Sequence, residues 1–208
     1  MKNPVLSDME LNEKEIYTHL FEGISRAGFV STKAKRLIRA KAKIVQFEKN
    51  EIVLEKGKIC RYCYFLVSGL MRAYFEKGIK DVTAWFMTGG DVAIGVTSFY
   101  TQKPSKEFIV AMEPTICVRL SYEDLELIYK ECVDFNVVGR RLTEKYHMLF
   151  TVRLSTIVDS PEEKYLTFLE EYPDLIGRVK SLDHIATYLG FSRETLTRVR
   201  RDLAKRVK

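Results

Sequence analysis

The stretch that decides the fold is Lys180-Ser-Leu-Asp-His-Ile-Ala-Thr-Tyr-Leu-Gly-Phe-Ser-Arg-Glu-Thr-Leu-Thr-Arg-Val-Arg-Arg-Asp-Leu203. It predicts two short helices joined by a tight turn. Ser181 is placed to cap the first helix by accepting from a free backbone N–H of its first turn. The apolar residues of this helix share one face: Ile185, Ala186 and Leu189. Gly190 is expected to end the helix, because glycine takes a left-handed backbone without steric cost.

The second predicted helix has one apolar and one charged face. Ser192 is placed to cap it. The apolar face consists of Leu196, Val199 and Leu203, and the charged face of Glu194, Arg198, Arg201 and Lys205. The small residue Ala186 lets the two helices approach closely, so the pair predicts a helix-turn-helix of the kind that binds DNA.

The start of the second helix offers the chemistry of base recognition. Arg193 lies where such motifs enter the major groove, and an arginine can donate two hydrogen bonds to guanine O6 and N7. Glu194 can accept a hydrogen bond from cytosine N4. The alternative is a solvated amphipathic helix held only by packing, since charge runs are often just soluble faces.

The positive charge of the chain is concentrated near its C-terminal end. The net charge is +6 over 208 residues. From position 176 onward nine Lys or Arg stand against three acids, so the rest of the chain is close to neutral. A basic segment on a neutral body is typical of a protein that binds the phosphate backbone of nucleic acid.

Hydropathy predicts a soluble cytoplasmic protein with no membrane partner. The longest apolar run, Tyr62–Val67, has six residues, whereas a bilayer span needs about twenty. Asp8, Glu10 and Glu13 stand where a signal peptide needs an apolar core.

Cysteine spacing gives only a weak metal signal. Cys60 and Cys63 form a C-x-x-C pattern that could hold zinc or an iron–sulfur cluster. Residues three apart on a strand point to opposite faces, so buried reduced thiols and no metal site are expected.

Two helices within residues 10–41 are expected, with Ser31 capping the second, followed by an antiparallel barrel or roll. Seven β-branched and aromatic runs are separated by turn residues: Ile44–Phe47, Ile52–Leu54, Tyr62–Val67, Leu70–Phe75, Val82–Phe86, Phe108–Met112 and Ile116–Leu120. Regular spacing of this kind predicts the roll. No helices alternate with these runs, which excludes a doubly wound sheet.

A helix over 121–130 and a long helix over 134–158 are expected next. The long helix carries apolar residues at three-four spacing: Phe135, Val138, Leu142, Leu149 and Val152. Such a seam is typical of helices that pack along each other, which favours a dimer interface; packing on the chain's own barrel is the alternative. Asp159-Ser-Pro161 is expected to form a hinge before a helix over 162–171.

This order of elements resembles the cyclic-AMP receptor protein and fumarate-nitrate regulator (Crp/Fnr) superfamily of bacterial transcription regulators. The most specific match is Gly190-Phe-Ser-Arg-Glu-Thr-Leu-Thr-Arg198. The resemblance implies an α+β fold with an antiparallel β-roll sensor domain (1–133), similar to cyclic-nucleotide-binding jelly rolls. A long dimerisation helix (134–158) and a helix-turn-helix domain (159–208) follow. The family's β-hairpin wing has no full counterpart before Lys208.

Position by position, the resemblance implies roles for the residues of the reading helix. The base readers are Arg193, Glu194 and Arg198, and the phosphate binders are Ser192 and Thr195. Arg200, Arg201 and Lys205 are expected to supply backbone contacts in place of the wing. The implied partners are double-stranded DNA with a near-palindromic site, a second copy of the chain, and RNA polymerase.

The sensor half departs from the family members that bind cyclic nucleotides. Those members hold the ribose with a glutamate and the phosphate with an arginine–serine pair, where this chain has Val96 and Lys106-Glu107. Val96 cannot accept a hydrogen bond and Glu107 would repel a phosphate, which disfavours cyclic AMP. An unknown effector is expected to contact Val96, Thr97, Ser98, Lys106, Tyr146, His147 and Phe150, and no cofactor is implied.

The sequence therefore predicts a homodimeric, DNA-binding transcription regulator with an effector other than cyclic AMP, or with none. The alternative is a metabolite or cyclic-nucleotide sensor that acts through protein partners. An enzyme of the metal-dependent barrel kind is disfavoured, because His19, His147 and His184 all fall on predicted helices and no catalytic constellation stands out.

Overall fold

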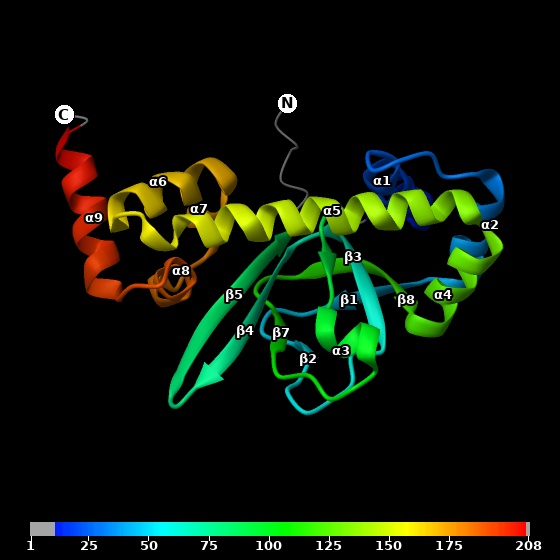
Figure 1. The fold of residues 1–208 in the computed structure, drawn as a ribbon, viewed down its shortest axis with the longest axis horizontal. Coiled ribbons are helices and arrows are strands. Elements are labelled where there is room, and N and C mark those ends of the chain that lie inside the picture. Colours follow the sequence, from blue (N-terminus) through cyan, green and yellow to red (C-terminus); the bar gives the residue numbers. More distant parts are fainter. Residues whose placement is uncertain (1–10, 207–208) are drawn as a thin grey trace. The chain divides into compact units, whose positions relative to one another are not determined.

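The computed structural model describes residues 11–206, which form two compact units. One unit contains the chain up to Ala73 together with Phe86–Lys145. The other contains Tyr74–Trp85 together with the chain from Tyr146 onward. Figure 1 shows the elements in chain order, coloured from the first helix to the last.

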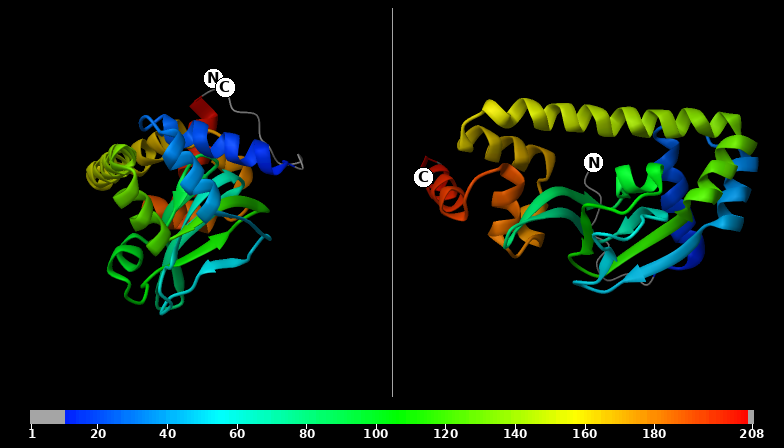
Figure 2. Two further views of the ribbon diagram at one scale, coloured as in Figure 1. Left: turned by 90° about the vertical axis from the view of Figure 1, so that its right-hand side faces the viewer. Right: turned by 60° about the horizontal axis from the view of Figure 1, so that its bottom comes forward.

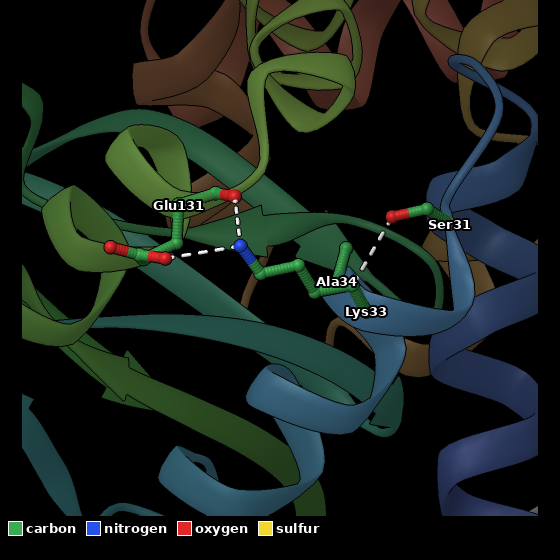
Figure 3. Close-up of polar contacts among 4 residues, drawn as sticks. All are labelled: Ser31, Lys33, Ala34 and Glu131. Carbon is green, nitrogen blue, oxygen red and sulfur yellow. Dashed lines mark hydrogen bonds and ion pairs between the residues drawn. The ribbon is translucent and has the colours of Figure 1, made fainter.

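Two helices open the first unit: α1 (Glu13–Ser25) and α2 (Thr32–Lys41). The predicted cap of α2 is confirmed, because the Ser31 hydroxyl accepts a hydrogen bond from the Ala34 N–H at 3.2 Å. Lys33 then ties α2 to the end of α4 (Tyr122–Glu131). Its ammonium donates to the Glu131 backbone oxygen at 2.7 Å and to the Glu131 carboxylate at 3.0 Å (Figure 3).

The strands of the described chain form two four-stranded sheets. They are β1 (Lys43–Phe47), β2 (Ile52–Leu54), β3 (Tyr62–Ser68), β4 (Leu70–Lys77), β5 (Lys80–Thr88), β6 (Val92–Ala93), β7 (Phe108–Ala111) and β8 (Thr115–Ser121). One sheet has the order β1-β8-β3-β6 and the other β2-β7-β4-β5. The pairs β1–β8, β2–β7, β3–β6 and β3–β8 are antiparallel. Fully buried side chains such as Leu66, Ile109 and Cys117 fill the core.

Three helical segments complete the first unit: α3 (Val96–Thr101), α4 (Tyr122–Glu131) and the first part of α5 (Val133–Ser155). Ser121 caps α4 by accepting from the Asp124 N–H at 3.0 Å. Phe135 and Val138 anchor the start of α5, because both are buried. The ring of Phe135 packs against Tyr129 with 5.6 Å between centroids.

The second unit joins the outer part of the β4–β5 hairpin to the C-terminal helices. These are the end of α5, the 3-10 turn η1 (Thr156–Val158), α6 (Pro161–Glu171), α7 (Leu175–Arg178), α8 (Leu182–Leu189) and α9 (Arg193–Arg206). Phe168 lies at the centre of an aromatic cluster. Its ring centroid is 5.4 Å from that of Tyr172 and 5.5 Å from that of Tyr188. This cluster gives the C-terminal helices a common core.

The predicted α+β class with an antiparallel roll is confirmed. All seven predicted strands are present within two residues of their expected ends, whereas β6, α3 and α7 were not predicted. The predicted domain boundaries stay a prediction, and their ends at 1–10 and 207–208 lie outside the described residues. Between residues 11 and 206, no helix is both long and apolar enough to cross a membrane.

The predicted cap of the first helix of the helix-turn-helix is wrong. Ser181 occupies the N-cap position of α8, but its side chain makes no capping hydrogen bond. Its backbone carbonyl accepts from the His184 N–H at 3.2 Å instead, so the start of α8 is held by the backbone alone.

Candidate nucleic-acid interface

The turn between α8 and α9 has the predicted geometry. Gly190 has φ +80°, a left-handed conformation that favours glycine, and its N–H reaches the carbonyls of Ala186 and Thr187. The Phe191 N–H bonds the Ala186 carbonyl at 3.1 Å, which closes the end of α8. Arg193 begins α9 after only three turn residues, so the two helices are adjacent, as in a helix-turn-helix.

One face of α9 is fixed by packing. Leu196 is fully buried and Val199 is buried. On α8, Ile185 and Ala186 are also buried, and α9 contacts both α8 and α6. The opposite side of α9 is consequently presented to solvent.

The three predicted base readers lie on this solvent side. Arg193, Glu194 and Arg198 are all exposed. The Arg193 guanidinium lies 3.4 Å from the Asp183 carboxylate of α8, an exposed ion pair that contributes little to stability and can open for a ligand. The arrangement offers two guanidinium donors and one carboxylate acceptor, which is the set that reads guanine and cytosine edges.

Glu194 is held as a carboxylate at the start of α9. Its pKa is lowered by a hydrogen bond from its own backbone N–H, by the Ser192 hydroxyl, and by the nearby positive charges of Arg193 and Lys80. An ionised acid at a helix N-terminus is also favoured by the helix dipole. Glu194 is therefore available as an acceptor.

The two predicted hydroxyl contacts are partly engaged within the chain. The Ser192 hydroxyl caps α9 by accepting from the Thr195 N–H at 3.3 Å, which confirms the predicted cap. It also lies 3.3 Å from the Thr195 hydroxyl. Ser192 is exposed and Thr195 is half-buried. Hydroxyls in this position at a helix start can still donate to a phosphate oxygen.

The predicted phosphate-binding cations differ in their surroundings. Arg201 and Lys205 are exposed, and Arg201 lies 3.3 Å from Asp202. Arg200 is half-buried and interacts with the Tyr165 side chain of α6, where it lowers the pKa of that phenol against the raising effect of burial. Arg200 therefore packs α9 onto α6, and its role as a phosphate contact stays a prediction.

The hairpin side chains that contact α8 were not predicted as part of this region. The backbone N–H of buried Thr83 in β5 donates to the Thr187 hydroxyl at 3.2 Å, and the two threonine hydroxyls lie 3.1 Å apart. The right-hand view of Figure 2 shows β5 passing α8, to which Thr83 is hydrogen-bonded. The sequence carries no local signal for this contact, because the partners are 104 positions apart.

Arg153 reinforces the same contact. Its guanidinium donates to the Tyr188 carbonyl at 3.1 Å and to the Thr83 carbonyl at 3.4 Å. It also lies over the Tyr188 ring, 4.1 Å from the centroid. Burial lowers the pKa of Arg153, and the neighbouring Tyr188, Tyr172 and Glu171 oppose that shift. The end of α5, the hairpin and α8 are thus linked by one side chain.

The predicted effector residues are divided between the two units, and their role as an effector site stays a prediction. In the first unit Val96, Thr97 and Lys106 are exposed and Ser98 is buried, while Tyr146, His147 and Phe150 belong to the second unit. Ser98 is engaged on both sides, because its hydroxyl accepts from the Cys60 N–H at 2.9 Å and donates to the Lys103 carbonyl at 2.5 Å.

Glu107 lies close to Gly95, at the start of α3. A Cβ at Gly95 would lie 3.3 Å from the Glu107 Oε1 and 2.7 Å from the Leu54 Cδ2, so Gly95 allows this close approach. Burial raises the pKa of the Glu107 carboxyl. The raised pKa favours the neutral acid, and only the ionised form of Glu107 would repel a phosphate beside the start of α3.

The predicted dimer seam is partly covered by the chain itself. Phe135 and Val138 are buried inside their own unit, so the prediction that they contact a partner is wrong. Leu142 and Leu149 are half-buried, and Val152 is 45% exposed. The strongly exposed apolar side chains on the end of α5 and on η1 are instead Met148, Phe150, Leu154, Ile157 and Val158.

Comparisons with known proteins were made by sequence and by structure. Residues 44–132, less than half of the chain, match the sequence family described as the cyclic nucleotide-binding domain. No curated protein is similar enough in sequence to this chain to count as a match.

Several solved structures share the fold over most of the chain. One is a putative transcriptional regulator of the Crp/Fnr family from Eubacterium rectale, with 18% identity, a TM-score of 0.67 and 85% of each chain covered. FixK2 from Bradyrhizobium japonicum has 20% identity and a TM-score of 0.65, with 79% of this chain and 85% of that chain covered. A CooA mutant from Carboxydothermus hydrogenoformans has 17% identity and a TM-score of 0.64, with 88% and 83% covered. The chain therefore has the fold of Crp/Fnr regulators.

Proposed function

We propose that this chain is a homodimeric, sequence-specific DNA-binding transcription regulator of the Crp/Fnr type. The observation that carries the proposal is the contrast between the two faces of α9. Leu196 and Val199 are buried, while Arg193, Glu194 and Arg198 are exposed on the other side. A rigidly packed helix that presents arginines and a carboxylate is suited to reading base edges in the major groove.

Charge supports the same partner. The segment from position 176 onward carries the whole net charge of the chain, and Arg198, Arg201 and Lys205 are exposed along α9. Contacts to DNA phosphates release condensed counterions, so binding by this segment is expected to weaken steeply with salt.

Dimerisation is supported by the apolar surface at the end of α5 and on η1. Met148 is 61% exposed, Phe150 52%, and Val158 90%. A second copy of the chain would cover these side chains and place two reading helices about 34 Å apart, one turn of DNA. The expected target is therefore a near-palindrome.

Any effector of this regulator is proposed to differ from cyclic AMP. Val96 is exposed, the Ser98 hydroxyl is already hydrogen-bonded on both sides, and Glu107 places an acid beside α3. These features disfavour a cyclic phosphate at this place. A regulator that binds DNA without any effector is equally consistent with them.

Two alanine variants test the role of the reading helix. Arg198→Ala should cost about 1 to 3 kcal/mol on the best site and relax specificity at one base pair, because a bidentate base contact is lost. Arg201→Ala should weaken binding to all sequences alike. Titration of both variants with specific and random duplexes measures this. An equal loss for Arg198→Ala on both kinds of DNA would refute its role as a base reader.

A further inference from the structure

The end of the β4–β5 hairpin carries two lysines and belongs to the same compact unit as the reading helix. We define the hairpin tip as residues 76–81, Glu-Lys-Gly-Ile-Lys-Asp. β4 ends at Lys77 and β5 begins at Lys80, with Gly78 between them at φ +64°. This tight turn places two lysines at the extreme end of the hairpin.

The tip is held in the same compact unit as the helix-turn-helix. Thr83, three residues from Lys80, bonds the Thr187 hydroxyl of α8 through both its N–H and its hydroxyl. Arg153 donates to the Thr83 and Tyr188 carbonyls and so fixes the strand and the helix together. The tip is therefore carried on a rigid support rather than on a free loop.

The side chains of the tip are available to a partner. Ile79 is 102% exposed, and Lys77 and Lys80 are exposed. Neither lysine makes a hydrogen bond or an ion pair with another of the residues 11–206. The two acids of the tip, Glu76 and Asp81, do interact with other groups of the chain. The two lysines are thus exposed and not held in an ion pair within the described residues.

The tip lies within electrostatic reach of the base-reading end of α9. Lys80 is one of the groups that lower the pKa of Glu194, in addition to the hydrogen bonds from the Glu194 N–H and Ser192. A helix that enters the major groove has a phosphate backbone along each wall of the groove. A cation fixed beside the start of that helix faces one of these backbones.

We infer that the hairpin tip binds the DNA phosphate backbone next to the groove read by α9, with Lys77 and Lys80 as the contacts. The inference rests on the proposed DNA-binding function and adds a second contact surface to it, contributed by the sensor-side hairpin. Phosphate contacts position the protein without reading bases, so the tip sets register and affinity but not sequence preference.

The test is the salt dependence of DNA binding by the full chain. The double variant Lys77→Ala/Lys80→Ala is compared with the wild type and with Lys43→Ala/Lys49→Ala, a control that removes two exposed lysines from the first unit. The probe is the duplex that the wild type selects. In the proposed homodimer the double variant removes four phosphate contacts, two per copy, so the slope of log K against log salt should fall by about 3.6, because each phosphate contributes about 0.9.

Two further measurements distinguish a direct phosphate contact from an indirect effect on the helix-turn-helix. Lys77→Arg/Lys80→Arg should keep the wild-type slope, and the ratio of specific to random binding should stay unchanged in the alanine variant. A slope for the alanine variant equal to that of the control would overturn the inference while leaving the proposed function intact. Absence of any DNA binding by the wild type would overturn both.

Discussion

Replacing Thr187 by valine should loosen the hairpin from α8. The Thr187 hydroxyl accepts from the Thr83 N–H at 3.2 Å, lies 3.1 Å from the Thr83 hydroxyl, and bonds the His184 carbonyl at 3.2 Å. Valine has the same branched shape but no hydroxyl, so the hydrogen bond from the Thr83 N–H to this side chain is lost. Thr83 has no exposed surface, and water cannot easily replace the lost bond.

The expected cost follows from that burial. The net value of a hydrogen bond is about 1 kcal/mol, and the loss of one at a buried group costs up to about 3 kcal/mol. The matched control is Thr197→Val on α9, where the hydroxyl donates to the Arg193 carbonyl at 2.9 Å on an exposed face. Both changes exchange threonine for valine on a helix, so differences in helix propensity cancel. The control should change stability by less than about 0.5 kcal/mol.

Urea unfolding followed by tryptophan fluorescence measures the difference. Trp85 is the only tryptophan of the chain, and its ring lies 5.8 Å from the Arg153 guanidinium in the second unit. The signal therefore reports on the unit that contains the contact, even if the two units unfold separately. Equal midpoints and slopes for Thr187→Val and Thr197→Val would refute the argument that this buried contact stabilises the unit.

Two other predictions concern the sensor unit and the dimer. Glu107→Gln should raise the melting temperature at pH 7, because burial raises the Glu107 pKa and makes its ionisation costly in the folded state. The gain should shrink as the pH falls through the raised folded-state pKa and vanish below the usual glutamate range; a gain of the same size at low pH would contradict this cause. Phe150→Asp should give monomers with weak DNA affinity, since the side chain is exposed on the proposed interface, whereas Thr18→Asp on α1 should not. Sedimentation would contradict the proposed interface by showing an intact Phe150→Asp dimer.

Signals that act over a few residues predicted much of the fold. The caps at Ser31 and Ser192 and the left-handed Gly190 each depend on contacts within four residues, and all are present. The strands followed from β-branched and aromatic runs between turns. Ser181 shows the limit of this reasoning, because a residue type suited to a cap does not force its side chain into the capping rotamer.

Elements that depend on distant neighbours were missed. α3 and α7 have six and four residues, too short to be stable without packing. The apolar residues of α5 were identified by their spacing. Spacing alone cannot distinguish residues that pack on their own chain from residues that pack on a partner. Phe135 and Val138 pack on their own chain.

In the candidate site, too, local patterns were predicted and contacts with distant segments were missed. The exposed face of α9 could be placed from periodicity, and Arg193, Glu194 and Arg198 are exposed as expected. The role of Arg200 depends on Tyr165 of α6, and that of Lys80 on a hairpin far away in the sequence. The sequence pattern of α9 alone predicts neither the contact of Arg200 nor the proximity of Lys80.

The most direct measurement is a selection of random duplex DNA by the purified protein near physiological salt, read out by sequencing. The account predicts a two-fold symmetric consensus with half-sites about ten base pairs apart, because two copies of α9 would enter successive major grooves. Enrichment of no sequence, without an effector and with cyclic AMP or a metabolite extract added, would contradict the central claim that this chain reads DNA.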